Sequence, residues 1–386
     1  MEKTLGVQNT KIKELVINGA NTSIPSGSAL SLDKLVMSQN GIRSALTTTW
    51  VLYSGGKITA LQKGAKALAK QAQESAQVTK ETQTLALIQI YFGQQLAQKV
   101  LALRENLLLG MQEHLDNATK LEKNGMLAKA QRLQAQVAYD SARRAREAAS
   151  YDLEKMQIAL QNLVGLPTYI KASTPIFIGP DIAGKKDDFM NFALNHNPRL
   201  AAISSLGEAA REKIKVERAD WYPSLYLFGQ YNLNKTGELL TDLDWIVGAG
   251  VKWTINSTQD RGYKEQSAAH EALAAKYALT DAQLQLSTQL SQAYDGLISA
   301  KKQYELTESS QLSARENMRV QEVSFREGTG TSNDVTDARV ALNNVQVDRL
   351  AAAYQYDLQL AQLLYASGQI DEFSQYIEKS NQVSFP

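Results

Sequence analysis

The sequence predicts a mainly α-helical fold with a small β part, in which one long antiparallel helical hairpin occurs twice. Two observations carry this prediction. The chain aligns with itself at a single dominant offset of 203 residues, without a gap from Trp50 to Gly165. Within each copy, long stretches without proline carry apolar residues at helical spacing. Units repeated in this way pack against each other to bury their apolar faces.

The repeat rests on residue types that seldom recur by chance at a constant offset. The aligned pairs include Trp50 with Trp253, Tyr91 with Tyr294, Gly125 with Gly328 and Gly165 with Gly368. We therefore expect a first repeat over 1–165, a linker over 166–189, a second repeat over 190–368 and a C-terminal tail over 369–386.

Each repeat is expected to contain one hairpin of two very long helices. In the second repeat an apolar seam follows the heptad spacing 4, 3, 4, 3, 4, at Leu286, Leu290, Ala293, Leu297, Ala300 and Tyr304. A glycine turn reverses the chain at Gly328, so this hairpin is predicted over about 261–367. The matching hairpin of the first repeat covers about 56–164 and has its tip at Gly125.

Short stretches of alternating apolar residues ahead of each hairpin predict β-strands. In the second repeat a lead helix over about 187–221 precedes strands over about 223–231 and 244–255. In the first repeat a lead helix precedes strands over about 23–32 and 42–53. Each chain is therefore expected to supply four strands.

The strand before the second hairpin has an apolar face that begins and ends in tryptophan. Trp245 and Trp253 share this face with the apolar residues between them, and lie about 26 Å apart along a strand. This distance matches the apolar band of an outer-membrane protein, whose two edges carry aromatic residues. Trp50 stands at the matching position in the first repeat. The alternative is a soluble sandwich strand with buried tryptophans.

Membrane-spanning strands would require several copies of the chain. Four strands from one chain cannot close a sheet, and an open sheet edge is not stable in lipid. Three chains would pool their strands into a 12-stranded transmembrane β-barrel. Their paired hairpins would give a trimeric α-helical tunnel of twelve long helices.

The composition excludes several classes of function. The 41 Lys+Arg against 40 Asp+Glu give a net charge of +1, and we find no basic cluster of the kind that binds nucleic acid. There is no Cys, and the three histidines, His114, His196 and His270, are interpreted as solvated helix residues without ligand partners. The sequence has no Gly-rich phosphate loop, catalytic triad or carboxylate pair. We therefore expect no enzyme activity, no cofactor, no resident metal and no nucleic-acid partner.

The order of these features resembles the TolC-like outer membrane efflux proteins over essentially the whole chain. The motifs are Asn-Pro-Arg-Leu at 197–200, Tyr-Pro-Ser-Leu at 222–225, and Phe-Arg-Glu-Gly at 325–328 followed by Asp-Val-Thr-Asp-Ala at 334–338. The resemblance implies a homotrimer in the outer membrane of a Gram-negative bacterium, with most of each chain in the periplasm. It also implies the exit duct of an efflux or type I secretion system, docked by a periplasmic membrane-fusion adaptor and an inner-membrane transporter.

The resemblance assigns roles to single residues as well. It implies that Trp50, Trp245 and Trp253 are membrane-interface aromatics in contact with outer-membrane lipid. It also implies that the linker and the tail lie around the waist of the tunnel. The adaptor-docking tips match four turn residues, Gly125, Met126, Gly328 and Thr329. Glycine there permits positive φ and gives a partner helix access to the backbone. Phe325 and Gly330 replace the Tyr and Arg that often hold the family's tip closed, so we expect other contacts, with Arg326 to a neighbouring Asp as a candidate.

Asp334 and Asp337 match the carboxylates that line the family's aperture constriction. Threefold symmetry would gather six carboxylates, which favours protonation or cation binding and predicts block of the pore by cations. The first repeat has glutamines at both matching positions, so only one hairpin per chain would contribute. The alternative is that both aspartates are first-turn residues of a helix capped by Ser332 or Asn333.

A second hypothesis for the function comes from a different class. A soluble coiled-coil scaffold or adaptor with a small β-domain would also contain long helices and a few strands. Such a protein would be a monomer or dimer that needs no detergent, whereas an export duct would be a trimer that does.

Overall fold

The computed structural model describes residues 3–11, 42–168, 170–179, 184–235, 244–255 and 260–382. The chain falls into two compact units. The first unit is Met1–Gln71 with Ile203–Ala278, and the second is Ala72–Ala202 with Leu279–Pro386.

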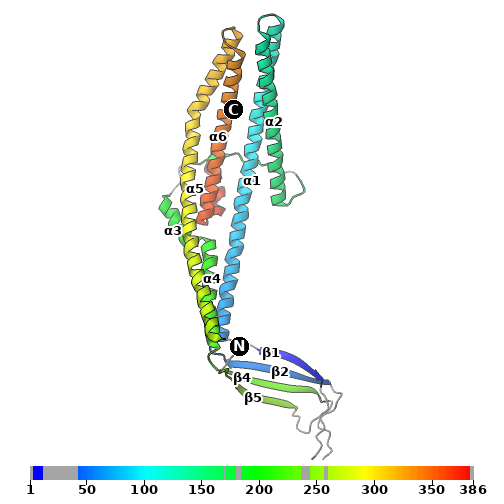
Figure 1. The fold of residues 1–386 in the computed structure, drawn as a ribbon, viewed down its shortest axis with the longest axis vertical. Coiled ribbons are helices and arrows are strands. Elements are labelled where there is room, and N and C mark those ends of the chain that lie inside the picture. The colour runs from blue at the N-terminus through cyan, green and yellow to red at the C-terminus, as the bar shows by residue number, and fades with distance from the viewer. Residues whose placement is uncertain are drawn as a thin grey trace, which may run out of the picture. The chain divides into compact units, whose positions relative to one another are not determined.

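Four long helices form the two hairpins that the sequence predicts (Figure 1). Helix α1 covers Lys57–Lys123 and is followed by α2 over Lys129–Val164, while α5 covers Arg261–Arg326 and is followed by α6 over Ser332–Ser367. The prediction of long helical hairpins is confirmed. An offset of 203 residues carries the bounds of the first pair onto those of the second to within one residue.

Glycines in the left-handed conformation stand at the ends of these helices. Gly165 and Gly368, with φ of 70° and 79°, follow the last residues of α2 and α6. Gly125 and Gly328, with φ of 72° and 76°, lie in the turns between the paired helices. Because glycine has no Cβ, it adopts this conformation at little cost. The glycines that align across the repeat therefore mark where each helix ends.

The predicted lead helix over about 187–221 is two helices. Helix α3 covers Lys186–His196 and α4 covers Pro198–Ala219, with Asn197 in extended conformation between them. A residue before proline disfavours helical backbone, and Pro198 can begin a helix because its missing N–H needs no partner there. The Asn197 amide donates to the Ala366 carbonyl at 2.9 Å, which fixes the break against α6.

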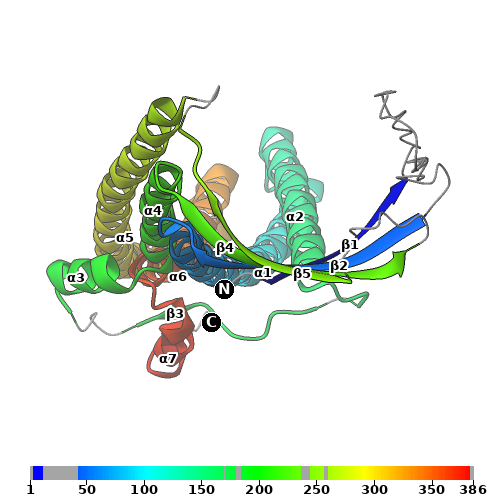
Figure 2. The ribbon, with the colours of Figure 1, turned by 90° about the horizontal axis from the view of Figure 1, so that it is seen from below.

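One antiparallel sheet belongs to the first unit (Figures 1 and 2). Its strands are β1 (Lys3–Lys11), β2 (Ile42–Tyr53), β4 (Ser224–Lys235) and β5 (Trp245–Lys252), paired in the order β1-β2-β4-β5. A second, two-stranded sheet pairs β3 (Phe177–Ile178) with β6 (Asn381–Gln382) in the second unit.

The beginning of the first repeat differs from the prediction. The predicted strand over about 23–32 lies outside the described residues. A lead helix at the start of this repeat is wrong for residues 3–11, which form β1. This stretch alternates apolar Leu5 and Val7 with polar residues, and it pairs with β2 along its whole length. Pairing with a distant strand thus decides its conformation.

Linker residues pack on α1 within the second unit. Gln94 accepts a hydrogen bond from the Ala172 N–H and donates one to the Ile170 carbonyl, each at 2.8 Å. The Tyr91 hydroxyl accepts from two further backbone N–H groups of this segment, each at 2.9 Å. Side chains of α1 therefore satisfy the backbone of a segment that has little regular structure of its own.

The tail packs against the same linker. It contains the 3-10 helix η1 (Ile370–Glu372) and helix α7 (Phe373–Glu378). The Phe177 ring lies 5.9 Å from the rings of both Phe92 and Phe373, at tilted or edge-to-face angles. Beneath it, the Asp357 carboxylate accepts a hydrogen bond from the Phe177 N–H at 3.4 Å, and burial raises the pKa of Asp357 well above its usual range. A location of the linker and tail at a tunnel waist stays a prediction.

The helices are long but not strongly apolar. Among the residues that the structure describes, no helix contains a stretch that is both long and apolar enough to cross a membrane.

Candidate functional site

One face of the four-stranded sheet is apolar and exposed. On β5, Trp245, Val247 and Val251 have exposed fractions of 66%, 70% and 67%, and Trp253 directly after the strand has 58%. In the register of the sheet Trp50 of β2 lies opposite Leu227 of β4, which lies opposite Ala249 of β5. Residues directly opposite each other share a face, so Trp50 belongs to the same surface. The alternative of a sandwich strand with buried tryptophans is wrong for this chain.

The other face of β5 has glycine where bulky side chains would collide with its neighbour strand. Gly248 and Gly250 lie opposite Phe228 and Tyr226 of β4. A Cβ added at either glycine would come within 2.6 Å of the facing ring. The alternation of Gly with apolar residues in β5 therefore reflects two different faces, one apolar and one covered by aromatic rings.

The two hairpin turns have the same geometry. The Met126 N–H donates to the Leu121 carbonyl and the Thr329 N–H donates to the Ser324 carbonyl, both at 2.9 Å. This is the six-residue Schellman bond, which a left-handed glycine permits. A Cβ added at Gly125 or Gly328 would meet no atom within 4 Å, so the backbone is open on that side. Contact of an adaptor with these turns stays a prediction.

Asp334 caps α6. Its carboxylate accepts hydrogen bonds from the Thr331 N–H at 2.9 Å and the Thr331 hydroxyl at 2.7 Å, and these bonds lower the pKa of Asp334. The capping alternative therefore holds for Asp334 but not for Asp337, and the N-cap residue is Thr331, not Ser332 or Asn333. Asp337 is exposed about one turn further along the same helix. An aperture role for both aspartates stays a prediction.

A buried histidine joins the two hairpins close to their turns. The ring of His114 on α1 hydrogen-bonds the Ser332 hydroxyl at the start of α6, with 2.8 Å between Nε2 and Oγ. The ring also lies 4.9 Å from the ring of Phe325 on α5. The interpretation of His114 as a solvated helix residue is wrong, because its side chain and that of Ser332 are buried. Burial and then the charge of Arg339 lower the pKa of His114.

Arg339 crosses from α6 to α1 beside this histidine. Its guanidinium forms an ion pair with Glu322 of α5. A Cβ added at Gly110 of α1 would lie 1.7 Å from a guanidinium nitrogen, so a larger residue there would require the Arg339 side chain to move. One turn further from the tip, the Asn343 amide donates to the Leu103 carbonyl at 2.9 Å. Arg339 and Asn343 thus connect α6 to α5 and α1 close to the turns. A link from Arg326 to a neighbouring Asp stays a prediction.

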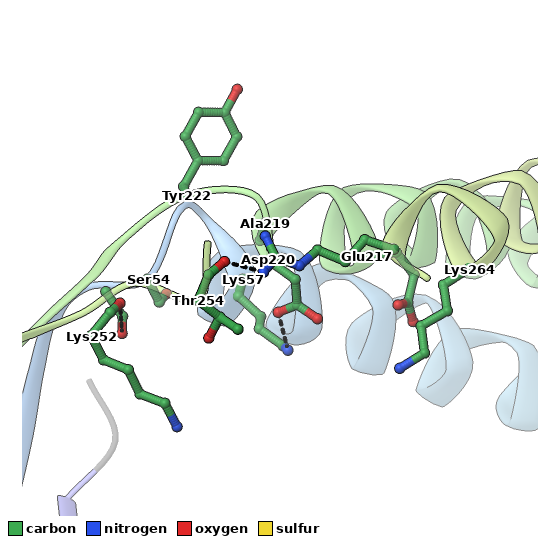
Figure 3. Close-up of a pocket in the computed structure, with 11 residues that line it drawn as sticks. Ser54, Lys57, Glu217, Ala219, Asp220, Tyr222, Lys252, Thr254 and Lys264 are labelled. Atoms are coloured by element: carbon green, nitrogen blue, oxygen red, sulfur yellow. Dashed lines mark hydrogen bonds and ion pairs between the residues drawn. The ribbon is translucent and has the colours of Figure 1, made fainter. Parts of the chain in front are cut away.

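A polar cavity of about 310 Å³ lies where the strands of the first unit meet its helices (Figure 3). Four cations and two carboxylates line it: Lys57, Lys252, Arg261, Lys264, Glu217 and Asp220. Lys57 forms an ion pair with Asp220, with 2.7 Å between Nζ and Oδ1. Arg261 donates to the Thr254 carbonyl, and its guanidinium lies 5.5 Å from the centre of the Trp221 ring. In the part of the chain that the structure describes, no three His, Cys, Asp or Glu side chains form a metal-ligand group.

Comparison with known families decides what this arrangement belongs to. The sequence profile described as "Outer membrane efflux protein" matches residues 190–369, which contain α4, β4, β5, α5 and α6. The matched segment, residues 190–369, belongs to the outer membrane efflux protein family. Proteins of this family are transport channels and not enzymes, and they form trimers that work in tripartite systems.

Curated relatives and solved structures agree with this membership. The chain is 25% identical over 267 residues to the alkaline protease secretion protein AprF of Pseudomonas aeruginosa, which covers 67% of the chain and 52% of AprF. It is 24% identical over 190 residues to the outer membrane protein TolC of Vibrio cholerae, which covers 48% of the chain and 43% of that protein. The chain thus spans about half the length of the curated relatives it matches.

The fold is that of solved outer-membrane channel proteins. A crystal structure of CusC superposes with a TM-score of 0.78 at 16% identity, covering 95% of this chain and 83% of that one. VceC of Vibrio cholerae superposes with a TM-score of 0.75 at 16% identity, covering 95% and 86%. At this identity the likeness establishes the fold.

Several contacts in this protein were not predicted from its sequence. Ser332 and Asn343 contact residues more than 200 positions away, and Arg339 contacts a different helix. No local sequence pattern predicts such contacts. Gly110 was the available signal, because a glycine inside a long helix costs stability unless packing requires it.

Proposed function

We propose that this protein is the outer-membrane exit duct of a tripartite efflux or type I secretion system in a Gram-negative bacterium. Three copies would form a channel-tunnel that receives substrates from an inner-membrane transporter and a periplasmic adaptor and passes them to the exterior. The observation that carries the proposal is the exposed apolar face of the sheet, which begins at Trp245 and ends at Trp253. A water-facing protein seldom exposes so continuous an apolar surface.

The edges of the sheet support assembly with other copies. Among the described residues β1 and β5 each pair with one neighbouring strand only, so their outer edges present backbone groups that another strand could pair with. In lipid such groups cost several kcal/mol each unless another strand satisfies them. The edge of β5 from one copy can meet the edge of β1 from the next, which closes twelve strands in a trimer.

In the same assembly, the hairpin turns would contact the adaptor and the two aspartates would line the aperture. The open backbone at Gly125 and Gly328, with Met126 and Thr329 beside them, would receive the adaptor. Asp334 and Asp337 would line the narrowest aperture, where a cation blocks the pore. Capping by Asp334 and a charge at the aperture are compatible, because the carboxylate stays ionised and exposed.

Extraction and sizing test the proposal directly. The protein, expressed with a secretory leader, should fractionate with outer membranes, require detergent and have the mass of a trimer. Reconstituted trimers should conduct ions in a planar bilayer. A soluble monomer or dimer obtained without detergent would instead support the coiled-coil scaffold.

A further inference from the structure

Within the second unit, α6 of the second hairpin packs on α1 of the first. The Tyr354 hydroxyl of α6 donates to the Gln89 carbonyl of α1 at 3.4 Å, and a Cβ added at Gly93 would lie 3.6 Å from this hydroxyl. Closer to the turns, the Asn343 amide of α6 donates to the Leu103 carbonyl at 2.9 Å, and Leu103 is 7% exposed. Gln89, Gly93 and Leu103 therefore define an α1 face that α6 covers.

The aligned face of α5 is exposed. The 203-residue offset carries the α1 face onto Gln292, Gly296 and Leu306, which define the α5 face. Leu306 has an exposed fraction of 63%, nine times that of its counterpart on α1. Gln292 is exposed as well, whereas its counterpart is half-buried. The same positions are thus covered in one copy of the repeat and open in the other.

The contacts inside each hairpin do not explain this difference. A Cβ added at Gly93 would meet Met156 of α2 at 3.5 Å, and one added at Gly296 would meet Gln359 of α6 at 2.6 Å. Met156 and Gln359 are themselves aligned by the offset of 203 residues. Each glycine therefore faces the same position of its own partner helix, and the two faces differ in what lies outside the hairpin.

A second pair of aligned leucines shows that α5 is not simply more exposed than α1. Leu109 of α1 and Leu312 of α5 have exposed fractions of 61% and 63%. They lie six positions after Leu103 and Leu306, which is about 120° around a helix. The exposure of the two copies therefore agrees on this side of the helices and differs on the side that α6 covers in α1.

Helix α2 has a corresponding uncovered face. Tyr151 aligns with Tyr354 and is 62% exposed, and Ile158, two turns further along, is 50% exposed where the aligned Ala361 is fully buried. Helices α2 and α6 have 36 residues each, yet α6 buries sixteen of them and α2 four. The two faces that meet within the chain, on α6 and α1, thus have two exposed counterparts, on α2 and α5.

We propose that the α2 face, defined by Tyr151 and Ile158, packs on the α5 face of the next copy of this chain. The Tyr151 side chain would lie at Gly296 and the Gln292 carbonyl, and Leu306 would be buried. The inference rests on the proposed function, because a trimer provides the next copy. A contact between two different faces of the same chain closes only in a ring. In that ring, hairpins would meet alternately within a chain and between chains.

Cross-linking of introduced cysteines tests the contact, because the chain has no Cys of its own. A short bismaleimide is preferable to a direct disulfide, since a tyrosine side chain separates the two backbones. In the full-length trimer in detergent, Tyr151→Cys with Gln292→Cys should give covalent species of two and three chains on a denaturing gel. The matched control, Tyr354→Cys with Gln89→Cys, should form its cross-link within one chain and keep the single-chain mass. A trimer in which the first variant gives only single chains would contradict the proposal.

A charge on the α5 face gives an independent measurement. Leu306→Asp would place a carboxylate in the contact, so the protein concentration at which half of the trimer dissociates should rise by more than about tenfold. Leu312→Asp changes a leucine of equal exposure on the same helix and should shift this concentration by less than about twofold. Equal shifts for the two variants would overturn the contact.

Sizing and thiol accessibility separate this inference from the proposed function. A conducting trimer in which Tyr151→Cys reacts fully with a bulky maleimide would retain the duct but refute the contact between copies, and would leave the α2 face to another partner such as the adaptor. A protein without introduced cysteines that is monomeric in detergent would refute the duct, and the contact with it.

Discussion

The protonation state of the buried His114 side chain affects how the helices pack near the hairpin turns. Its ring contacts α5 and α6 at once, through Phe325 and Ser332, and a positive charge on Arg339 lies nearby. In a neutral ring one nitrogen can share a hydrogen bond with the Ser332 hydroxyl, and the tautomer follows that bond. Protonation would add a second cation beside Arg339 in a largely buried site.

The His114 site predicts a loss of stability in mild acid. Its folded-state pKa is lowered, while the unfolded value is about 6.5. The unfolded chain therefore takes up the proton first, so the stabilisation is complete above about pH 6.5 and is lost as pH falls through the folded pKa. Thermal unfolding of the solubilised trimer between pH 8 and pH 5 should show this decrease.

Two variants isolate the contribution of this ring. His114→Gln keeps a hydrogen-bonding group for Ser332 but cannot titrate, so its midpoint should depend less on pH in this range. His270→Gln removes an exposed histidine of α5 and should behave like the wild type. An unchanged pH slope in His114→Gln would show that other groups cause the loss.

At the scale of the elements, most of the long helices and strands can be predicted from the sequence. Heptad spacing, the absence of proline and the aligned glycines locate all four long helices, because these features act within a few residues of each other. The break at Asn197 is also local, but it was missed because the apolar pattern continues through Pro198. Strand β1 and the packing of linker on tail depend on partners far along the chain, and alternation alone does not identify those partners.

Gly110 and Gly64 of α1 allow a test of helix packing against helix propensity. Gly64→Ala should raise stability by about 0.5–1 kcal/mol, since its Cβ would meet its nearest atom, on Glu212, at an ordinary 3.7 Å. Gly110→Ala should displace the Arg339 guanidinium and weaken its ion pair with Glu322. We expect it to be less stable than Gly64→Ala by about 1–3 kcal/mol.

Unfolding midpoints of both variants in the same detergent give the comparison. Adding Arg339→Ala to each variant completes the measurement, because removal of Arg339 should abolish the penalty of Gly110→Ala. If Gly110→Ala gains as much stability as Gly64→Ala, the side chain of Arg339 does not need the space that this glycine provides.

At the scale of the whole molecule, a net charge of +1 conceals an uneven distribution. The cations of the cavity in Figure 3 come from separate elements, so only the fold brings Lys57, Lys252 and Lys264 together. The two faces of the sheet are likewise visible as alternation, but their full extent depends on the register between strands. The net charge of the chain therefore does not describe the charge of a single cavity.

The apolar face predicts a strong dependence of membrane assembly on side-chain polarity. Val247→Lys places a charge on the exposed apolar surface, where burial in lipid costs about 2–4 kcal/mol near the middle of the bilayer. Gln230→Lys introduces the same residue on the other face, since Gln230 lies opposite Ile246. We expect the yield of trimer from outer membranes to fall sharply for the first variant and little for the second. Equal yields would mean that the apolar face does not contact lipid.

The agreement of helix bounds between the two copies has a consequence for engineering the molecule. Both hairpins measure the same distance from their first residue to their turn, although they share few side chains. Deleting seven residues from each helix of one hairpin would preserve its heptad phase but withdraw its turn by about 10 Å relative to the other. The same deletion in both would shorten the protein and keep the two turns level. Deletions matched in both hairpins should therefore be tolerated, whereas a deletion in one hairpin alone should not.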